Sequence, residues 1–492
     1  MRPASVRDVA AAVGGRVSDP APGGAASTDI RGVSIDSRSV APGDLFVALA
    51  GTRVDGHDFV EDAFAHGAAA AMVASDRLPA SAQTQTPAVP GPLVIVPDPG
   101  AALLSLAAAE RATATATVVG ITGSTGKTST KDFAGAVLET TLRTVRSPAS
   151  FNNEIGLPLT ILSAPPDAQA LVLEMGARGR GQIRALCDIA RPTIGIVTNV
   201  GVAHMQLFGS QEAIRDAKAE LPEALPDDGV AILNADDPVV RAFVRRTHAR
   251  PVLFGLGDAD VTAADVDVDP ATGRASFTLR TPSGEGRVGL RAPGAHMVPN
   301  ALAAAALGDA MGIPFDAIAR ALGRAALSAG RMEVLAAPMG VRVVNDAYNA
   351  NPTSMAAALR AARAMAGAGR CVAVLGGMAE LGPIGPAEHE RVGELVVRLG
   401  VDDLVAVGSA AAVIAASAER EGMEPERIVR ASGADEALDA VRSLLRPGDV
   451  VLVKASRVEG LDRLARALAS EGANVSAGAN GSARSAGAGA AR

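Results

Sequence analysis

The segment that most constrains this chain is a short apolar run that enters a glycine-rich turn and ends in Gly-Lys-Thr. Residues 118–128 read Val-Val-Gly-Ile-Thr-Gly-Ser-Thr-Gly-Lys-Thr, which predicts a buried strand, a tight turn and the start of a helix. Glycines in such a turn let backbone N–H groups approach phosphate oxygens, and the helix N-terminus adds a favourable dipole. We expect an ATP phosphate site at Gly123, Ser124, Thr125, Gly126, Lys127, Thr128 and Ser129.

Within this loop, Lys127 and Thr128 have distinct expected roles. The ammonium of Lys127 would reach the β- and γ-phosphates, and the Thr128 hydroxyl would bind a magnesium ion. The strict phosphate-loop pattern has glycine where this chain has Ile121, so the match is close but incomplete. Lys131, one helical turn further on, is interpreted as a solvated helix residue.

The phosphate loop lies in a long alternation of apolar runs and helical segments. Fully apolar strands separated by helices indicate a parallel sheet covered on both faces. The predicted fold class is α/β with three domains: a small mixed α/β domain at 1–115, a central ATP-binding domain with a mostly parallel sheet at 116–329, and a Rossmann-like domain at 330–469. Period-two alternation over residues 275–290 predicts an antiparallel hairpin at the edge of the central domain.

Composition argues against several functional classes. The net charge of −7 argues against broad nucleic-acid or anionic-membrane binding, and no run is long and apolar enough to span a bilayer. Residues 1–15 lack the apolar core of a signal peptide, and the two cysteines form no metal-ligand or redox motif. We expect a cytoplasmic protein with a disordered tail at 470–492, where Ala, Gly, Ser and Asn occur without periodicity.

Lysine is rare in this chain. Only four of the 46 basic residues are lysines, namely Lys127, Lys131, Lys218 and Lys454. Because arginine occurs almost everywhere that a positive charge would serve, the remaining lysines are candidates for sites that arginine cannot fill. An ammonium is compact and can lose its proton to react. Tyr348 is likewise the only tyrosine.

Three polar residues follow the apolar runs of the central domain. Glu174 ends one run, His204 follows the next, and Lys218 lies on the helix after it. Ligands gather at the carboxyl ends of the strands in open α/β sheets, so we expect Glu174 and His204 to face the crevice of the phosphate loop. With the Thr128 hydroxyl they would hold magnesium, which prefers hard ligands. The alternatives are a surface charge at Glu174, a helix cap at His204 and an exposed ion pair at Lys218.

Further motifs, taken with the phosphate loop, resemble the Mur ligase family over nearly the whole chain except the tail. The segments that carry the resemblance are Gly120–Thr128, Phe151–Leu159, Glu174–Ala177, Asn199–His204, Ala217–Glu220, Asn234–Pro238, Asn300–Ala303, Gly330–Glu333, Asp346–Ser354 and Gly376–Gly382. In the N-terminal domain, Asp36–Phe46 and Asp55–His57 are similar to the family's uridine-nucleotide segment. The motifs Asp346–Ser354 and Gly376–Gly382 are most similar to the members that add a dipeptide.

The resemblance implies an ATP-dependent amide ligase of peptidoglycan precursor synthesis. Its substrates would be UDP-N-acetylmuramoyl-tripeptide and D-alanyl-D-alanine, joined through an acyl-phosphate intermediate. The implied cofactors are ATP and Mg²⁺ at two sites. The C-terminal domain would close over ATP, and we expect a monomer.

The resemblance also implies roles for individual residues. The catalytic residues would be Lys127, Glu174, His204 and Lys218. Lys218 would carry a carbamate formed with CO2, and Thr128, Glu174, His204 and Lys218 would be the metal site. Arginine cannot supply the neutral amine that this adduct needs. Outside the phosphate loop, ATP would contact Asn300, Arg331 and Asp346. The UDP-linked substrate would contact Ser37, Arg38, Asp55, Gly56, His57, Asn152 and Asn153.

Other functions are consistent with parts of this pattern. A sibling ligase that adds diaminopimelate, lysine or glutamate, or a folylpolyglutamate-type synthetase, would share the phosphate loop. The motif at Asp346–Pro352 argues against these siblings. A P-loop kinase or a non-catalytic nucleotide-binding relative is a different class. The joint presence of Lys127, Glu174, His204 and Lys218 disfavours an inactive relative, and a kinase would not need an amine acceptor.

Overall fold

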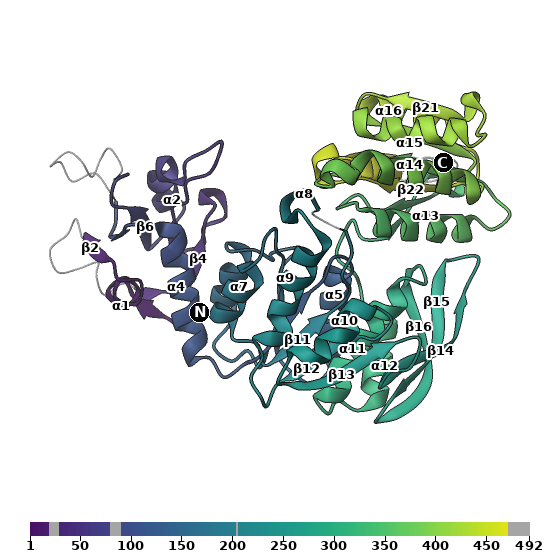
Figure 1. Ribbon diagram of the computed structural model, residues 1–492. Helices are drawn as coiled ribbons and strands as arrows, with labels where there is room; N and C mark the ends of the chain where they lie inside the picture. The colour runs from purple at the N-terminus through teal and green to yellow at the C-terminus, as the bar shows by residue number, and fades with distance from the viewer. Residues whose placement is uncertain (19–28, 79–89, 203–204, 471–492) are drawn as a thin grey trace, which may run out of the picture.

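The computed structural model describes residues 1–18, 29–78, 90–202 and 205–470, which form four β-sheets (Figure 1). The sheets have two and five strands in the N-terminal region, nine in the central region and six in the C-terminal region. Most neighbouring strands are parallel and are separated in sequence by helices, which confirms the α/β class. His204 and the predicted tail from residue 471 onward lie outside the described residues.

The N-terminal region is a small mixed unit. Its strands are β1 (Ala4–Ser5), β2 (Arg16–Ser18), β3 (Asp29–Ile30), β4 (Gly32–Ser34), β5 (Asp44–Val47), β6 (Ala70–Ala74) and β7 (Leu93–Val96). The five-stranded sheet has the order β2-β7-β6-β5-β4, with β4 to β7 parallel and β2 antiparallel, and β1 pairs with β3. Its helices are α1 (Val6–Ala12), α2 (Val60–Ala65) and α4 (Pro99–Thr113).

The central region is built on the nine-stranded sheet. Its strands are β8 (Thr117–Thr122), β9 (Thr144–Arg146), β10 (Ala170–Glu174), β11 (Ile194–Val197), β12 (Val230–Asn234), β13 (Arg250–Gly255), β14 (Val261–Val268), β15 (Arg274–Thr281) and β16 (Gly284–Pro293). The order is β16-β15-β14-β13-β12-β11-β8-β10-β9. Neighbours from β9 to β14 are parallel, and β14, β15 and β16 are antiparallel. The predicted edge hairpin is therefore confirmed as β15–β16.

Helices cover both faces of this sheet because its middle strands are apolar on both sides. The helices are α5 (Lys127–Leu138), α6 (Gly156–Ser163), α7 (Gln182–Ala190), α8 (Met205–Phe208), α9 (Gln211–Glu223), α10 (Pro238–Arg241), α11 (Met297–Ala310) and α12 (Phe315–Arg324). Val119 and Ile121 of β8 belong to the core with α5 and α11, whereas Val118 belongs to the core with α6 and α7. Strand β8 is therefore packed on both faces, and the phosphate loop follows directly from its C-terminal end.

The C-terminal region repeats the alternation of strands and helices. Its strands are β17 (Glu333–Ala336), β18 (Arg342–Asn345), β19 (Cys371–Leu375), β20 (Asp403–Val407), β21 (Ile428–Ala431) and β22 (Val450–Lys454), and its helices include α13 (Pro352–Ala366), α14 (Gly385–Arg398), α15 (Gly408–Arg420) and α16 (Ala434–Leu444). The order is β17-β18-β22-β19-β20-β21, in which β17 is antiparallel to β18. β19, β20 and β22 are buried at every position.

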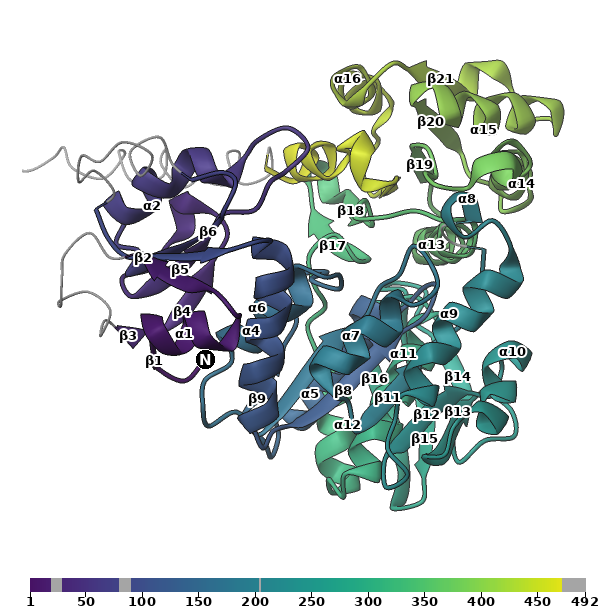
Figure 2. The same cartoon turned by 60° about the vertical axis from the view of Figure 1, so that its left-hand side comes forward.

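The N-terminal and C-terminal regions both adjoin the central region, and the C-terminal region lies above it in the view of Figure 2. Helix α4 packs against α6 and α7, and α8 contacts the turn Gly382–Ile384 of the C-terminal region. Strands β14 and β17 were not anticipated, since both include exposed and half-buried positions and lack a continuous apolar run. Among the described residues, no helix combines the length and apolar character needed to cross a membrane.

Candidate active site

A cleft of about 1040 Å³ is lined by residues of the central and C-terminal regions. The carboxyl ends of both parallel sheets open into it. On the central side, β10 and β12 end at the cleft in Glu174 and Asn234. On the C-terminal side, Asp346 follows β18, and Lys454 ends β22. The two sheets therefore present their ligand-binding edges to one shared space.

The phosphate loop is shaped by glycines and by the end of β11. Gly123 and Gly126 have φ angles of 146° and 80°, which favour glycine. A Cβ at Gly123 would lie 1.9 Å from Thr198 Oγ1, so a larger residue cannot fit there. Asn199 Oδ1 accepts a hydrogen bond from the Thr125 N–H at 2.9 Å, and Asn199 Nδ2 donates to Thr125 Oγ1 at 2.8 Å.

Lys127 points back over this loop. Its Nζ donates to the Gly123 carbonyl at 2.6 Å, and among the described residues it forms no ion pair. Burial lowers the pKa of Lys127, an effect that the Glu174 carboxylate opposes. An ammonium held by neutral carbonyls keeps its charge available for an anionic ligand, as expected for a group that contacts phosphate.

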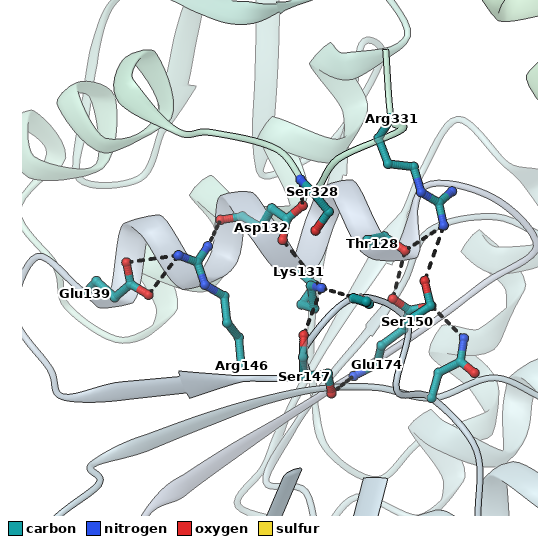
Figure 3. A network of polar contacts seen from close by, with 12 residues as sticks. Thr128, Lys131, Asp132, Glu139, Arg146, Ser147, Ser150, Glu174, Ser328 and Arg331 are labelled. Atoms are coloured by element: carbon teal, nitrogen blue, oxygen red, sulfur yellow. Dashed lines mark hydrogen bonds and ion pairs between the residues drawn. The ribbon is translucent and has the colours of Figure 1, made fainter. Parts of the chain in front are cut away.

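Glu174 is a buried carboxylate with neutral hydrogen-bond donors. It is 1% exposed, and its two oxygens accept from the Thr128 hydroxyl at 2.9 Å and from Asn152 Nδ2 at 2.8 Å (Figure 3). The alternative of a surface charge at Glu174 is therefore wrong. Within the described chain, no three His, Cys, Asp or Glu side chains form a metal cluster. Thr128 and Glu174 nevertheless fit magnesium, which uses few protein oxygens together with water and phosphate.

Lys218 is buried on α9 and also lines the cleft. Its Nζ has no hydrogen-bond or ion-pair partner among the described residues. The acidic neighbours are engaged elsewhere: Asp216 pairs with Arg180 at 2.8 Å, and Glu220 accepts from the Gly181 N–H at 2.6 Å. The alternative of an exposed ion pair is therefore wrong. Burial and the charge of Lys127 lower the pKa of Lys218 to about 7.

The C-terminal side of the cleft has an ion pair and a cation–π stack. Lys454 Nζ lies 2.5 Å from Asp346 Oδ2, and both residues are buried. Two guanidinium groups contact the Tyr348 ring, with Arg331 4.4 Å and Arg457 5.5 Å from its centre. Arg331 also donates to Thr128 Oγ1 at 3.1 Å. It thus connects the C-terminal region directly to the phosphate-loop helix.

The remaining predicted nucleotide residue, Asn300, supports the phosphate loop. It lies on α11, lines the cleft, and accepts a hydrogen bond from the Thr130 hydroxyl at 3.3 Å. A Cβ at Gly126 would lie 2.4 Å from its Oδ1, so the loop and α11 are closely packed at this point. Ser129 is buried next to Thr128.

The residues predicted to bind the UDP-linked substrate fall into two groups. Asp55, Gly56 and His57 form one turn, in which His57 Nδ1 lies 2.6 Å from Asp55 and Nε2 accepts from the Ala74 N–H at 2.9 Å. The His57 ring therefore holds its own turn with both nitrogens. In a neighbouring turn, Arg38 pairs with Asp36 at 2.7 Å.

The second group lies apart from the N-terminal turns. Asn152 and Asn153 line the cleft near Glu174, where Asn153 Oδ1 accepts from the Gly156 N–H at 2.9 Å. Ser37 is buried in the N-terminal turn next to Arg38. Arg53, which was not singled out from the sequence, lines the cleft from the N-terminal region.

Three more cleft or network residues were missed or misjudged. Lys131 is 2% exposed and is not the solvated helix residue expected. Its rarity as a lysine was the available signal, but its position one helical turn beyond the phosphate loop was interpreted as a solvated one. Ser150 and Arg457 carried no sequence signal, because an isolated serine or arginine is common in any exposed turn.

Comparison with protein families matches three successive segments of the chain. Residues 29–111 match the model described as Mur ligase family, catalytic domain. Residues 121–308 match the Mur ligase middle domain, and residues 330–457 match the Mur ligase, glutamate ligase domain. The chain belongs to the Mur ligase family. The resemblance found in the sequence is therefore confirmed.

Individual relatives of this Mur ligase align over nearly their full length. This chain is 42% identical to the UDP-N-acetylmuramoyl-tripeptide–D-alanyl-D-alanine ligase of Mycobacterium tuberculosis, and the alignment covers 95% of this chain and 98% of the relative. A crystal structure of MurF from Acinetobacter baumannii matches with a TM-score of 0.82 and 30% identity, covering 96% and 99% of the two chains. The MurF ligase of Thermotoga maritima in complex with ADP matches with a TM-score of 0.75 and 29% identity, covering 90% and 98%.

Proposed function

We propose that this Mur ligase joins D-alanyl-D-alanine to UDP-N-acetylmuramoyl-tripeptide and converts ATP to ADP and phosphate. The observation that carries the proposal is the shared cleft. In it, the phosphate loop of the central region faces the cationic and aromatic side chains of Arg331, Tyr348, Lys454 and Arg457. The near-full-length similarity to ligases of that name, at 42% identity, supports this substrate pair. We further propose that the enzyme is a cytoplasmic monomer of peptidoglycan precursor synthesis.

The residues of the cleft suit a two-step reaction. In the first step, a carboxylate oxygen of the tripeptide attacks the γ-phosphorus of ATP, forming an acyl phosphate and releasing ADP. In the second, the dipeptide amine attacks the acyl carbon, forms the amide, loses a proton and releases inorganic phosphate. Lys127 and the loop N–H groups would bind the phosphates throughout, offsetting the charge that moves with the γ-phosphoryl group.

Thr128 and Glu174 would hold a magnesium ion at the phosphates. The ion would neutralise phosphate charge. Asn152 would orient the Glu174 carboxylate, and Arg331 would orient the Thr128 hydroxyl. His204 would be a further ligand, as the family resemblance implies. Arg331, Asp346 and Asn300 would contact the nucleotide, with the first two reaching it from the C-terminal domain. That domain would span 330–469, after a central domain at 116–329 and an N-terminal domain at 1–115.

Lys218 would carry a carbamate and support a second magnesium ion. A buried amine that has no partner among the described residues, with a pKa lowered to about 7, is neutral often enough to attack CO2, forming an N–C bond and releasing a proton. The product is an anion with two carboxylate-like oxygens, which suits a site that gathers cations. The UDP-linked substrate would lie between the N-terminal turns at Ser37–Arg38 and Asp55–His57 and the cleft residues Asn152 and Asn153.

The test of the function is whether phosphate release depends on both acceptor and donor. With purified protein, ATP and magnesium, we expect phosphate only when UDP-N-acetylmuramoyl-tripeptide and D-alanyl-D-alanine are both present. Phosphate release with the UDP-linked substrate alone would indicate an uncoupled hydrolase, and ADP formation without phosphate release would indicate a kinase. Replacing the dipeptide by diaminopimelate, lysine or glutamate tests the sibling activities, and equal rates with any of these would overturn the dipeptide assignment.

Lys127→Ala should lower turnover by roughly 10²–10³-fold, since one preorganised contact to developing charge is lost. Steady-state kinetics with saturating substrates would measure it. Arg111→Met is a suitable control, because Arg111 is a buried cation that donates to the Ala190 carbonyl at 2.8 Å, outside the cleft. Equal turnover in Lys127→Ala and the parent would contradict the assignment of this loop to ATP.

A further inference from the structure

Lys131 makes three polar contacts that have no role in the chemistry described so far. Its Nζ donates to the carbonyls of Ser147 at 2.9 Å and Ala149 at 2.6 Å, and it lies 3.5 Å from Asp132 Oδ1 (Figure 3). An ammonium has three N–H donors, of which the two carbonyls accept two, and the Asp132 carboxylate balances the charge as an ion pair. A buried charge needs this degree of compensation to be tolerated.

Lys131 binds the segment 147–152, and two residues of this segment form hydrogen bonds with Glu174. Ser147 Oγ accepts a hydrogen bond from the Glu174 N–H at 3.2 Å. Ala149 has a φ of 44°, an uncommon conformation for a residue with a Cβ, and its carbonyl is one of the two that Lys131 binds. Beyond it, Ser150 accepts from Arg331 at 3.4 Å, and Asn152 donates to Glu174 at 2.8 Å.

Asp132, the partner of Lys131, holds the connection between the central and C-terminal regions. Its Oδ2 accepts a hydrogen bond from the Ser328 N–H at 2.7 Å, across 196 positions of sequence. Ser328 lies three residues before Arg331, the residue that donates to Thr128. Thr128, Lys131 and Asp132 lie on neighbouring turns of α5, at spacings of three and four residues that share one face of a helix.

We propose that Lys131 and Asp132 form a positioning pair for the magnesium side of the ATP site. Lys131 fixes the segment 147–152 against α5, so that Glu174 and Asn152 stand opposite Thr128. Asp132 fixes the backbone at Ser328, so that Arg331, three residues further on, reaches the Thr128 hydroxyl. Neither residue lines the cleft, so both act through other groups. This inference rests on the proposed use of ATP and magnesium, and not on the identity of the amine acceptor.

The geometry also explains why this position has a lysine in a chain dominated by arginine. The two carbonyl acceptors and the Asp132 carboxylate surround one nitrogen, which suits a compact ammonium. A guanidinium spreads five donors over a planar fork and would leave buried N–H groups without acceptors. The argument that the rare lysines occupy sites unsuited to arginine therefore applies to Lys131 as well, although it lies outside the cleft.

The inference is tested by nucleotide binding, so that it does not depend on ligase turnover. Calorimetry would measure the Kd of a nonhydrolysable ATP analogue with magnesium and with a chelator, giving the magnesium enhancement for each variant. We expect Lys131→Met to lose roughly 10-fold or more of this enhancement, the range found when residues behind a metal ligand are removed. Arg111→Met, which removes a buried cation elsewhere, should lower thermal stability and leave the enhancement unchanged.

An unchanged enhancement in folded Lys131→Met would overturn the proposal and leave Lys131 as a stabilising residue only. If Lys131→Met does not fold, Ser147→Ala replaces it, because it removes only the acceptor of the Glu174 N–H. We expect a smaller loss of enhancement in that variant, and no loss would also overturn the proposal. Should the parent bind magnesium and the ATP analogue but fail to use D-alanyl-D-alanine, the proposed function fails while this test still gives an answer.

Discussion

Two buried lysines line the same cleft, Lys218 from helix α9 of the central region and Lys454 from the end of β22, and their surroundings differ. On the C-terminal sheet, Lys454 forms an ion pair with Asp346 at 2.5 Å and donates to the Asn349 carbonyl at 3.0 Å. On the central side, Lys218 has no such acceptor among the residues that the structure describes. Burial lowers the pKa of both amines, but only at Lys454 does a carboxylate within hydrogen-bond distance oppose that shift.

The difference separates a cation that supports the fold from an amine available for reaction. A paired ammonium stays protonated and contributes stability through its partner, and removing one member of such a pair leaves an uncompensated charge. A buried amine without a partner costs stability in its charged form, and its ordinary outcome is to lose the proton. The same residue type therefore serves two purposes in one cleft.

The largest expected effect comes from Lys218. Lys218→Ala should lower ligase turnover by roughly 10³-fold or more, because the proposed carbamate, an anionic ligand for magnesium, could no longer form. Short-chain carboxylates added in solution should restore part of the rate. Lys218→Arg should be inactive and resist rescue, since its guanidinium is permanently charged. A fully active Lys218→Arg enzyme would show that a simple cation suffices at this position.

The pKa of Lys218 gives the same comparison a pH dependence. Its value of about 7 in the folded chain lies below the ordinary 10.5, so between these values the unfolded chain binds the extra proton. Stability of CO2-free protein should therefore rise as pH increases from about 7 to about 10.5. Lys218→Met should lack this part of the slope in denaturant unfolding followed across that range. Identical slopes for parent and variant would mean that the amine is protonated and paired.

The next effect is on stability and concerns Lys454. Lys454→Met should reduce the free energy of unfolding by about 3–5 kcal/mol, since Asp346 is left buried without its counter-ion. Adding Asp346→Asn should recover part of that loss by removing the unpaired charge. In the parent, Asp346 Oδ1 accepts from the Met332 N–H at 3.1 Å, and an amide oxygen can still accept this bond. Lys218→Met in CO2-free buffer is the matched variant and should cost little. Equal losses for Lys454→Met and Lys218→Met would erase the contrast between the two sites.

The smallest effect is expected at Tyr348, on the C-terminal wall. Tyr348→Leu removes the ring face against Arg331 and Arg457, each contact contributing about 0.5–1 kcal/mol. We expect the KM for ATP to rise by up to roughly 10-fold, because Arg331 loses part of its orientation toward Thr128. Tyr348→Phe keeps the ring and should behave like the parent. A similar rise in Tyr348→Phe would assign the effect to the hydroxyl.

The contiguous features of this protein were readable from its sequence. The strand Thr117–Thr122, its glycine-rich turn and the helix from Lys127 are local, because apolar runs, glycine conformation and helix spacing act over a few residues. Glu174 was expected to end an apolar run, and it is the last residue of β10. Glu174 could be placed at the ligand-binding edge for the same reason, since parallel strands end together.

What only the tertiary structure decided is which charges have partners. Whether Lys131 is solvated or buried, and whether Lys218 or Lys454 has a counter-ion, depends on residues tens to hundreds of positions away. The Asp132–Ser328 bond spans 196 positions, and the Lys454–Asp346 bond spans 108. Sequence pattern gives the residue types and the faces of their elements, but the free energy of a buried charge is fixed by the groups that folding brings around it.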